Sequence, residues 1–388
     1  MEFKFTAEHE ALRAEVRAFL AGTLPREGSA SRPTDQENWP RQMAFLRNLA
    51  GRKWVAPAWP VPYGGLGWKH VNQMIFSEEL SYAGAPEAGR VFSVGMIGPT
   101  LIVHGSDQQK REHLPRITSG DVVWCQGYSE PGAGSDLAAL QTRAVRDGDD
   151  YVVNGQKIWT TGAHHADWCF MVVRTNPDAP KHKGISFLLV DMKTPGITVQ
   201  PIVNMAGYHE FNQVFFEDVR VPVANRVGEE NNGWYVAMTL LDFERSNVAS
   251  IAANQRVLDQ LAGYLREQRP GGTYRDVLRH RLADLCVGNA IGRLLSYRTA
   301  WMQETGKLVN TEASVIKVFA TELAQRISNF GVNLQGPGGA LEPGSKCATL
   351  GGELAKDLLS NVSPTIYSGS SEIQRNIIAT RGLGLPRD

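Results

Sequence analysis

The sequence is poor in cysteine, and its few cysteines do not suggest a disulfide framework or a metal site. The four are Cys125, Cys169, Cys286 and Cys347. No two of them have the close spacing that zinc ligands use. Each lies in an apolar or helix-forming context, so we expect reduced and buried thiols. The nine histidines also lack a ligand spacing, and no metal is expected.

Long apolar runs and an excess of one charge are missing as well. No segment has the length of a transmembrane span, and the start of the chain lacks the apolar core of a secretory signal. Lysine plus arginine number 40, as do aspartate plus glutamate, so the formal net charge is zero. This balance argues against general binding to nucleic acid or to a membrane surface, although a local basic patch stays open. We therefore expect a cytoplasmic protein.

The hydrophobic pattern divides the 388 residues into three regions. Residues 1–120 carry apolar residues at helical spacing, which predicts an N-terminal helical domain. Residues 121–230 hold short β-rich runs between Gly, Asn, Asp and Pro, which predicts a small barrel or sandwich. Residues 231–388 are helical again and predict a bundle of four helices. The expected fold class is therefore α+β, with a helical domain before and after the central β domain.

The same pattern predicts the individual elements. In the first region helices are expected over 5–20, 39–49, 71–83, 91–104 and 108–114, the last one stopping ahead of Pro115. Strands are expected over 151–153, 168–173, 185–190, 197–201 and 213–216. In the third region one long helix is expected over 234–268, followed by helices over 277–305, 311–329, 348–359 and 372–381.

The stretch from Trp124 to Thr161 is the most informative part of the chain. Ser129–Asp136 reads Ser-Glu-Pro-Gly-Ala-Gly-Ser-Asp, a loop whose glycines let a ligand approach the backbone closely, with ordinary turn geometry as the alternative. Asn154-Gly155 between β-rich runs is a hairpin signal. Two neighbouring strands would then surround one glycine loop with polar and aromatic side chains. Such a wall suits a flat aromatic cofactor with polar edges.

Three ordered motifs carry a resemblance to a known family. They are the loop Glu130–Asp136, the run Gly-Gln-Lys-Ile-Trp-Thr-Thr over 155–161, and the closing run Tyr-Ser-Gly-Ser-Ser-Glu-Ile-Gln-Arg over 367–375. On these motifs the chain resembles the acyl-CoA dehydrogenases, which are flavoproteins. The resemblance extends from about residue 5 to the C-terminus. It implies FAD as the cofactor and the conversion of an acyl-CoA thioester to the 2,3-enoyl-CoA.

The resemblance also implies which residues meet the cofactor. The residues that would contact the flavin ring are Gln126, Tyr128, Ser129, Trp159, Thr160 and Thr161, with Thr161 near N5. A tryptophan buried in the core is the alternative for Trp159. Two histidines, His164 and His165, follow this run. Adjacent side chains of a strand point to opposite faces, so we expect no more than one of them to face the pocket.

A second set of residues would hold phosphate groups. Gly369, Ser370 and Ser371 precede a helix, and free N–H groups at a helix start attract phosphate. By resemblance that phosphate belongs to FAD and is held by Gly369, Ser370 and Glu372. Ser135 matches a residue that lies between a cofactor phosphate and the CoA part of the substrate. Without the resemblance this signal is weak, because many capped helices bind nothing.

The resemblance implies that the catalytic base of this chain is not at the position that many family members use. Many family members carry a Glu directly after the Tyr of the closing motif, where this chain has Ser368. A second group carries the base on the first long C-terminal helix, in a Leu-x-x-Glu-Arg run. Leu241–Arg245 matches that run, so Glu244 is the predicted base for the α-proton, while the β-hydrogen leaves as hydride to flavin N5. Burial in an apolar pocket would raise its pKa, as a base needs.

Alternatives remain for these carboxylates. Glu244 could be an exposed helix residue paired with a nearby arginine. Glu372 lies close to Ser368 and is a second candidate base. However, Ser371-Glu372-Ile373-Gln374 has the form of a capping box with Ser371 as N-cap, which favours a structural role for Glu372.

The residues that the resemblance places near the substrate are Ser135, Asp242, Arg245, Tyr367 and Ser368. For Asp242 and Arg245, an ion pair on a helix surface is the alternative. The length and shape of the acyl chain are not readable from these residues.

Two family motifs that reach the cofactor of a neighbouring subunit are degraded. The Arg-x-x-Phe-Gly turn is replaced by Arg266–Gly272, which lacks Phe-Gly, and the Gln-x-x-Gly-Gly-x-Gly run by Asn333–Gly339. We therefore expect a tetramer, and we hypothesise that it is an α2β2 assembly with a related chain that supplies these contacts. A non-catalytic FAD- and CoA-binding subunit and an oxidase are the alternatives. Electron-transferring flavoprotein is the acceptor that the resemblance implies.

Overall fold

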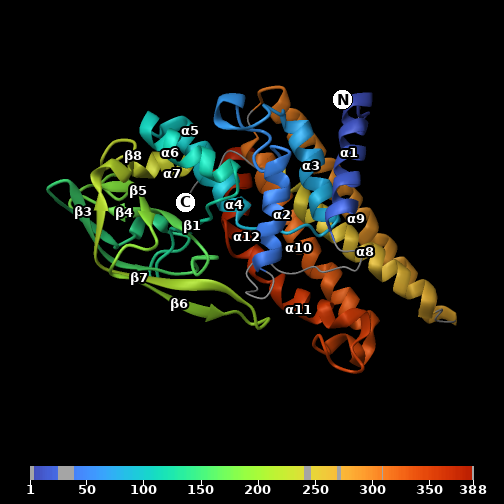
Figure 1. The fold of residues 1–388 in the computed structure, drawn as a ribbon. Helices are drawn as coiled ribbons and strands as arrows, with labels where there is room; N and C mark the ends of the chain where they lie inside the picture. The colour runs from blue at the N-terminus through green and yellow to red at the C-terminus, as the bar shows by residue number, and fades with distance from the viewer. Residues whose placement is uncertain (1–3, 25–38, 240–245, 269–271, 308, 387–388) are drawn as a thin grey trace. The chain divides into compact units, whose positions relative to one another are not determined.

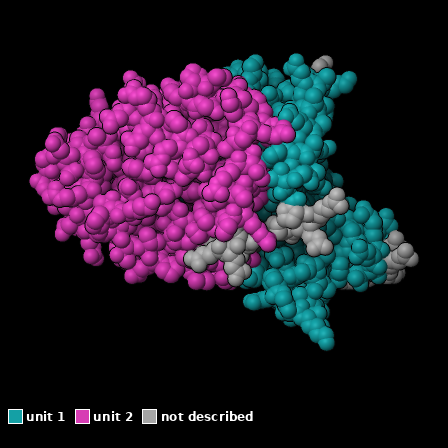
Figure 2. Space-filling view, in the orientation of Figure 1, with its two compact units in different colours: residues 1–29, 69–85, 245–388 teal, residues 30–68, 86–244 magenta. Residues whose placement is uncertain are grey.

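The computed structural model describes residues 4–24, 39–239, 246–268, 272–307 and 309–386. The chain forms two compact units (Figure 2). Unit 1 consists of Met1–Ser29, Lys69–Ala85 and Arg245–Asp388, and unit 2 of Ala30–Trp68 and Pro86–Glu244. Among the described helices, none combines the length and the hydrophobicity that crossing a membrane requires.

Unit 1 is helical. Its helices are α1 (Ala7–Thr23), α3 (His70–Tyr82), α8 (Val248–Gln268), α9 (Gly272–Glu304), α10 (Asn310–Leu334), α11 (Glu353–Ser360) and α12 (Ser371–Ile377). Short turns of other helix types are η6 (Gly336–Ala340), η7 (Thr349–Gly352), η8 (Ser363–Thr365) and η9 (Ile378–Gly382). The three long helices bury leucine-rich stripes against one another, including Leu258, Leu285 and Leu323.

An N-terminal helix completes the core of unit 1. Met74 and Ile75 of α3 are buried in one cluster with Val248 of α8 and Ala300 of α9. Residues from both ends of the sequence therefore share one helical core, in which α3 lies beside α8 and α9 (Figure 1).

Unit 2 contains the sheet. Its strands are β1 (Trp124–Gly127), β2 (Arg143–Asp147), β3 (Asp150–Lys157), β4 (Trp168–Arg174), β5 (Ile185–Asp191), β6 (Ile197–Val203), β7 (His209–Pro222) and β8 (Arg226–Val227). Its helices are α2 (Trp39–Gly51), α4 (Arg90–Phe92), the π-helix η2 (Ser93–Ile97), α5 (Gly98–His104), α6 (Asp107–Thr118) and α7 (Gly233–Thr239). The 3-10 turns are η1 (Val61–Tyr63), η3 (Leu137–Ala139) and η4 (Val223–Asn225).

The sheet runs in the order β6-β7-β3-β2-β4-β5-β8, and β1 pairs with β4 in parallel. Its central strands are buried on both faces. Phe170 and Val172 of β4 enter the core that α5, α6 and α7 cover, whereas Met171 and Val173 enter the core on the other face. This explains why β4 and β5 read as nearly continuous apolar runs, without the polar alternation of a half-exposed strand. The expected succession of N-terminal helices, central β domain and C-terminal helical domain is confirmed.

Two helix predictions were wrong. The single helix expected over 234–268 is interrupted: α7 ends at Thr239, α8 begins at Val248, and Asn247 between them has a left-handed φ of 50°. Asn tolerates this conformation and is favoured where a helix starts. The helix expected to stop ahead of Pro115 continues to Thr118 as α6.

The hairpin predicted at Asn154-Gly155 was also wrong. The β2–β3 turn is Gly148-Asp149, with Gly148 at a φ of 62°. Asn154 and Gly155 instead lie within β3, where the register with β7 shifts. The Asn154 side chain exchanges two hydrogen bonds with Asp218 of β7, at 3.0 and 2.9 Å. The Asn-Gly pair therefore marks a β-bulge, the other structure that needs a permissive backbone.

Replacing Gly155 by alanine is expected to destabilise unit 2 by about 2 kcal/mol, because the residue has a φ of +144° and its new Cβ would lie 2.7 Å from Thr142 Cα. Urea unfolding followed by tryptophan fluorescence measures the change. Gly132→Ala is the control, since its Cβ meets no atom of the described residues within 4 Å. Equal stability of the two variants would contradict the expectation.

Candidate active site

The glycine loop is closed on itself by backbone hydrogen bonds. Glu130 N donates to Ala133 O and Ala133 N donates to Glu130 O, both at 3.0 Å. Gly132 and Gly134 at its tip do not have a positive φ, and a Cβ at either would meet no atom of the described residues within 4 Å. Neither turn geometry nor internal crowding therefore explains these glycines. The space next to the loop tip is open to a ligand, which fits a cofactor that lies against the backbone.

A buried ion pair joins this loop to β3. Lys157 Nζ lies 2.8 Å from Glu130 Oε1 and donates to Tyr128 O at 3.1 Å. The lysine is fully buried, and Glu130 also accepts from the backbone N–H groups of Gln141 and Thr142. Burial opposes ionisation of Glu130, but Lys157 and these donors together lower the pKa of its carboxyl below the ordinary value. Burial lowers the pKa of Lys157, and Glu130 partly offsets this effect.

The motif run continues into a strained turn beside the loop. Ile158 N donates to Ser129 O at 2.9 Å, which places the turn next to the loop. Trp159 then has a left-handed φ of 60°, which is rare for an aromatic residue and is kept only where the surroundings enforce it. Its ring is 56% exposed and packs edge-on against Phe211. The alternative of a tryptophan buried in the core is therefore excluded.

Two buried hydroxyl groups near this turn have no hydrogen-bond partner among the described residues: Tyr128 Oη and Thr160 Oγ1. Burial raises the pKa of Tyr128 well above its ordinary value. Buried hydroxyls are normally paired, so these two have capacity for a polar ligand edge. The loop, the exposed Trp159 face and these hydroxyls fit a flat cofactor with polar edges.

Other predicted residues of unit 2 lie around this wall. Gln126 of β1 is half-buried and places its side-chain amide 3.6 Å from Met96 Sδ. Thr161 is half-buried, and Ser135 is exposed beside Asp136, which forms an ion pair with Lys181.

The residues predicted to hold phosphate, which are Gly369, Ser370 and Glu372, belong to unit 1. Ser368 and Gly369 have left-handed φ angles of 55° and 83°, and Lys317 Nζ donates to Gly369 O at 2.7 Å. The capping box predicted at Ser371 was wrong by one residue: the N-cap is Ser370, whose side chain accepts from Ile373 N at 3.4 Å. The Gln374 side chain donates to Ser368 O at 3.1 Å. It does not accept a hydrogen bond from the backbone N–H of the N-cap, as a capping box would require.

A hollow of about 680 Å³ adjoins the start of α12. It is lined by Ser371, Glu372 and Arg375, together with Gln325 and Arg326 of α10. Ser371 Oγ is buried without a partner among the described residues. Tyr367 is 53% exposed, and Ser368 is exposed as well.

Three predicted residues lie outside the described part of the chain: Asp242, Glu244 and Arg245. The predicted base is therefore not placed by the structure. The residues predicted to contact the flavin ring belong to unit 2, and those predicted to hold phosphate belong to unit 1.

Reading the motifs missed three polar residues that hold the site in shape. Lys157 and Glu130 belong to the motifs, but the sequence assigned them no role. Lys317 lies outside every motif. A signal for Lys317 was available, because it is a lone lysine on an otherwise apolar stretch of α10, and a charge in such a place is seldom without a partner. Among the described residues, no group of three or more His, Cys, Asp or Glu side chains could hold a metal ion.

The thiols and histidines differ from expectation. Cys125 and Cys169 are buried, but Cys286 is half-buried and Cys347 is exposed, so the prediction of four buried thiols was wrong; all four are free.

The prediction that His164 and His165 point apart was also wrong. They lie in a turn after β3, and their ring centroids are only 4.2 Å apart.

Comparison with known proteins identifies the family. The models for the N-terminal, middle and C-terminal domains of acyl-CoA dehydrogenases match residues 6–121, 125–219 and 231–383. The chain belongs to the acyl-CoA dehydrogenase family. It is thus an oxidoreductase that acts on acyl-CoA, and the recognition from three motifs is confirmed. FAD is the cofactor of this family and of this chain.

Relatives match over the whole length. Acyl-CoA dehydrogenase IpdE1 of Mycobacterium tuberculosis is 37% identical over 386 residues, which cover 98% of each chain. The solved structure of the Tcur3481-Tcur3483 steroid ACAD has a TM-score of 0.90 at 33% identity and full coverage of both chains. The ChsE4-ChsE5 complex from Mycobacterium tuberculosis has a TM-score of 0.87 at 36% identity, again with full coverage of both chains. Both structures are similar to this acyl-CoA dehydrogenase, and the name of each joins two proteins.

Proposed function

We propose that this chain is the catalytic subunit of an acyl-CoA dehydrogenase that uses Glu244 as its base. The observation that supports this most strongly is a full-length family match in a chain that has Ser368 after the closing tyrosine and keeps the Leu241–Arg245 run. Glu244 takes the proton from the carbon next to the thioester carbonyl. A carboxylate is a strong enough base for this step when it is desolvated. FAD held beside this base would supply the acceptor for the β-hydrogen, which leaves as hydride.

The residues proposed to hold the flavin ring are Gln126, Tyr128, Ser129, Trp159, Thr160 and Thr161. The open loop tip, the exposed Trp159 and the two unpaired hydroxyls support this assignment. Gly369, Ser370 and Glu372 are proposed to hold phosphate, which the left-handed Gly369 and the capped start of α12 support. Ser135 is proposed to lie between cofactor phosphate and CoA.

The proposed substrate is a bulky, steroid-like acyl-CoA. One similar structure, Tcur3481-Tcur3483, is that of a steroid ACAD. With Glu244 as the base, the position after Tyr367 is left to a small serine, which makes room for a branched or polycyclic acyl group. Asp242, Arg245, Tyr367 and Ser368 are proposed to contact the substrate.

The proposed assembly is an α2β2 tetramer with a related chain. The two degraded motifs, near Arg266 and over Asn333–Gly339, are those that serve a neighbouring subunit in the family. The Tcur3481-Tcur3483 and ChsE4-ChsE5 proteins are complexes of two different chains, which supports the proposal. In the alternative assembly this chain would be a non-catalytic FAD- and CoA-binding subunit. Electron-transferring flavoprotein is the proposed acceptor.

Anaerobic bleaching of the flavin tests the function. The chain is purified alone and after co-expression with related chains of the same genome, and each preparation is mixed with straight, branched and steroid-side-chain acyl-CoA thioesters. We expect yellow protein and bleaching only from the co-expressed complex, fastest with the bulky thioester. A yellow, active homotetramer would exclude the α2β2 assembly. A yellow complex that no thioester bleaches would contradict the dehydrogenase activity, and oxygen consumption without an acceptor would indicate an oxidase.

A further inference from the structure

Asn212 of β7 holds the turn that contains Trp159 from both sides. Thr160 N donates to Asn212 O at 3.0 Å, and Asn212 Nδ2 donates to Thr160 O at 3.0 Å. The next bond along the turn, from Gly162 N to Glu210 O at 3.0 Å, continues the same attachment to β7. The strained residue Trp159 thus lies between two anchored residues. Ile158 donates a backbone hydrogen bond to Ser129, and Thr160 forms two hydrogen bonds with Asn212.

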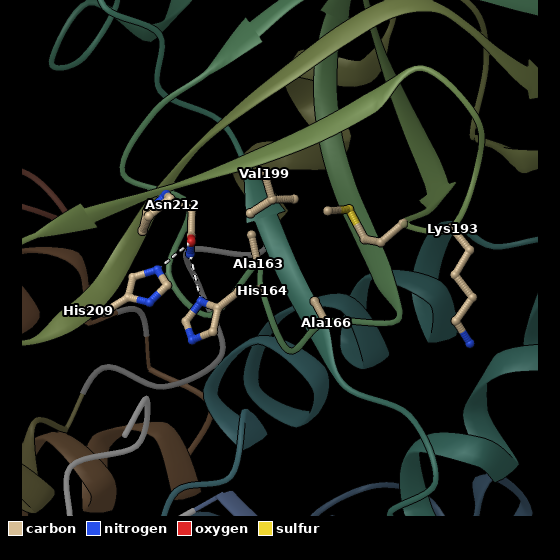
Figure 3. A pocket seen from close by; sticks show the side chains of 9 residues that line it. Ala163, His164, Ala166, Lys193, Val199, His209 and Asn212 are labelled. Carbon is tan, nitrogen blue, oxygen red and sulfur yellow. Dashed lines mark hydrogen bonds between the residues drawn. The ribbon is translucent and has the colours of Figure 1, made fainter. Parts of the chain in front are cut away.

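The orientation of the Asn212 amide follows from chemistry. A backbone carbonyl only accepts, so the amide nitrogen must face Thr160 O. The amide oxygen then faces His209 Nε2 at 2.8 Å, which must carry a hydrogen and donate. The second amide hydrogen points to His164 Nδ1 at 3.0 Å, which must be unprotonated and accept. Figure 3 shows the Asn212 side chain above the two rings, with a dashed line to each of them.

Asn212 is buried at the centre of this arrangement, and the two histidines are half-buried. Asn212 is completely buried, and the rings of His164 and His209 stack with centroids 4.0 Å apart. His165 packs on His164 and stacks on Trp39 of α2 at 4.1 Å. Burial and the neighbouring histidines lower the pKa of His165 to about 4, so this ring is neutral at neutral pH. His164 and His209, which hydrogen-bond to Asn212, line a hollow of about 310 Å³ (Figure 3).

We infer that Asn212 is the positioning residue for the flavin-facing turn, with His209 as donor and His164 as acceptor fixing its amide. The inference rests on the proposed role of Trp159, Thr160 and Thr161 at the flavin. A carboxamide is required because it is the side chain that donates to Thr160 and His164 while it accepts from His209. Asn212 does not touch the flavin itself in this scheme. It fixes the backbone that does.

The decisive variant is Asn212→Asp, which keeps the shape but removes both donors. Thr160 O then faces a carboxylate oxygen instead of an N–H group. We expect faster amide hydrogen exchange in the peptide that spans residues 158–162 of the apo-protein. We also expect FAD to bind at least about tenfold more weakly to the apo-form of the co-expressed complex that carries this variant, the effect of losing one buried hydrogen bond and leaving its acceptor unpaired. Exchange is measured by mass spectrometry and FAD binding by quenching of flavin fluorescence.

The histidines provide a rescue test. In His164→Asn the side-chain oxygen stands where Nδ1 stood and accepts, and in His209→Gln the amide nitrogen stands where Nε2 stood and donates. Both are expected to keep exchange and FAD affinity close to those of the wild type, whereas His164→Leu and His209→Leu are expected to resemble Asn212→Asp. Asn154→Ala is the matched control, because it also loses two side-chain bonds between β3 and β7 but lies in the exposed bulge.

The outcomes separate the inference from the proposed function. Failure of wild-type protein to bind FAD in any assembly would refute the proposed function, and exchange at 158–162 would still test the attachment of the turn. Wild-type FAD affinity in Asn212→Asp, or conservative histidine variants as weak as the leucine variants, would overturn the inference. If Asn212→Asp does not fold, the four histidine variants decide by the same criteria.

Discussion

Replacing Glu244 by glutamine is expected to slow flavin bleaching by an acyl-CoA about 10³- to 10⁴-fold, the upper part of the range that a general base contributes. The change removes the proton acceptor and keeps the size and hydrogen-bonding shape of the side chain. FAD content should therefore stay at the wild-type level. Anaerobic stopped-flow bleaching at saturating thioester gives the rate, and the visible spectrum gives the flavin content.

Two companion variants define the role of this carboxylate. Glu244→Asp withdraws the carboxylate by one methylene and should lie between wild type and Glu244→Gln, because proton transfer depends strongly on distance. Ser368→Glu added to Glu244→Gln restores a carboxylate at the position that many family members use, so partial recovery is expected. Unchanged bleaching in Glu244→Gln would show that Glu244 is not the base and would favour the non-catalytic-subunit alternative.

Glu372 serves as the negative control for the base. It is exposed in the first turn of α12, and a hydrogen bond from Ser370, with a smaller contribution from Arg375, lowers the pKa of its carboxyl. A base that removes a weakly acidic α-proton needs the opposite shift. Glu372→Gln should therefore leave the bleaching rate nearly unchanged, and any effect should appear in FAD affinity.

The parts of the fold that the sequence predicts well are those fixed by local pattern. Buried strands such as β4 and β5 and long helices such as α9 and α10 were placed within a few residues, because their apolar periodicity is strong. The errors lie where tertiary contacts decide. Asn154-Gly155 is a bulge because β7 pairs across it, and the α7–α8 break lies at Asn247, which the apolar periodicity of the segment conceals.

For the site, the motifs point to a stretch of the chain but do not show which of its residues face outward and which are internal. The letters of the loop and of the 155–161 run include residues that face outward, such as Trp159, and residues that are wholly internal, such as Lys157. Asn212 lies outside every motif and could not have been found by spacing. Its role follows from a pairing of β7 with the turn that is more than fifty residues away in sequence.

Replacing Lys157 by methionine is expected to destabilise unit 2 by about 3–5 kcal/mol, the usual effect of removing one partner of a buried ion pair. Methionine fills similar space, so the loss is electrostatic: Glu130 remains buried with only backbone donors. Urea unfolding of the apo-protein by tryptophan fluorescence measures the change. Arg326→Met is the control, because it breaks an exposed pair of the same 2.8 Å length, and such pairs contribute less than about 1 kcal/mol.

As pH falls, the contribution of Glu130 to stability should change in opposite directions in the wild type and in Lys157→Met. In the wild type the pKa of Glu130 is lowered on folding, so its contribution to stability is present above its ordinary pKa and is lost as pH falls through the lowered value. In Lys157→Met, we expect burial to outweigh the remaining backbone donors and to raise the pKa of Glu130. Lowering the pH then protonates the buried carboxylate, so the variant loses less stability relative to the wild type. The gap in stability between wild type and Lys157→Met should therefore narrow as pH falls from neutral.

A double variant distinguishes an unpaired charge from a general packing defect. Lys157→Met with Glu130→Gln removes both charges and should be more stable at neutral pH than Lys157→Met alone, because replacing both partners of a buried pair is far less damaging than removing one. If the double variant is less stable than the single one, Glu130 is held mainly by the N–H groups of Gln141 and Thr142. The loop would then keep its shape without the lysine, and the flavin wall would depend on backbone bonds alone.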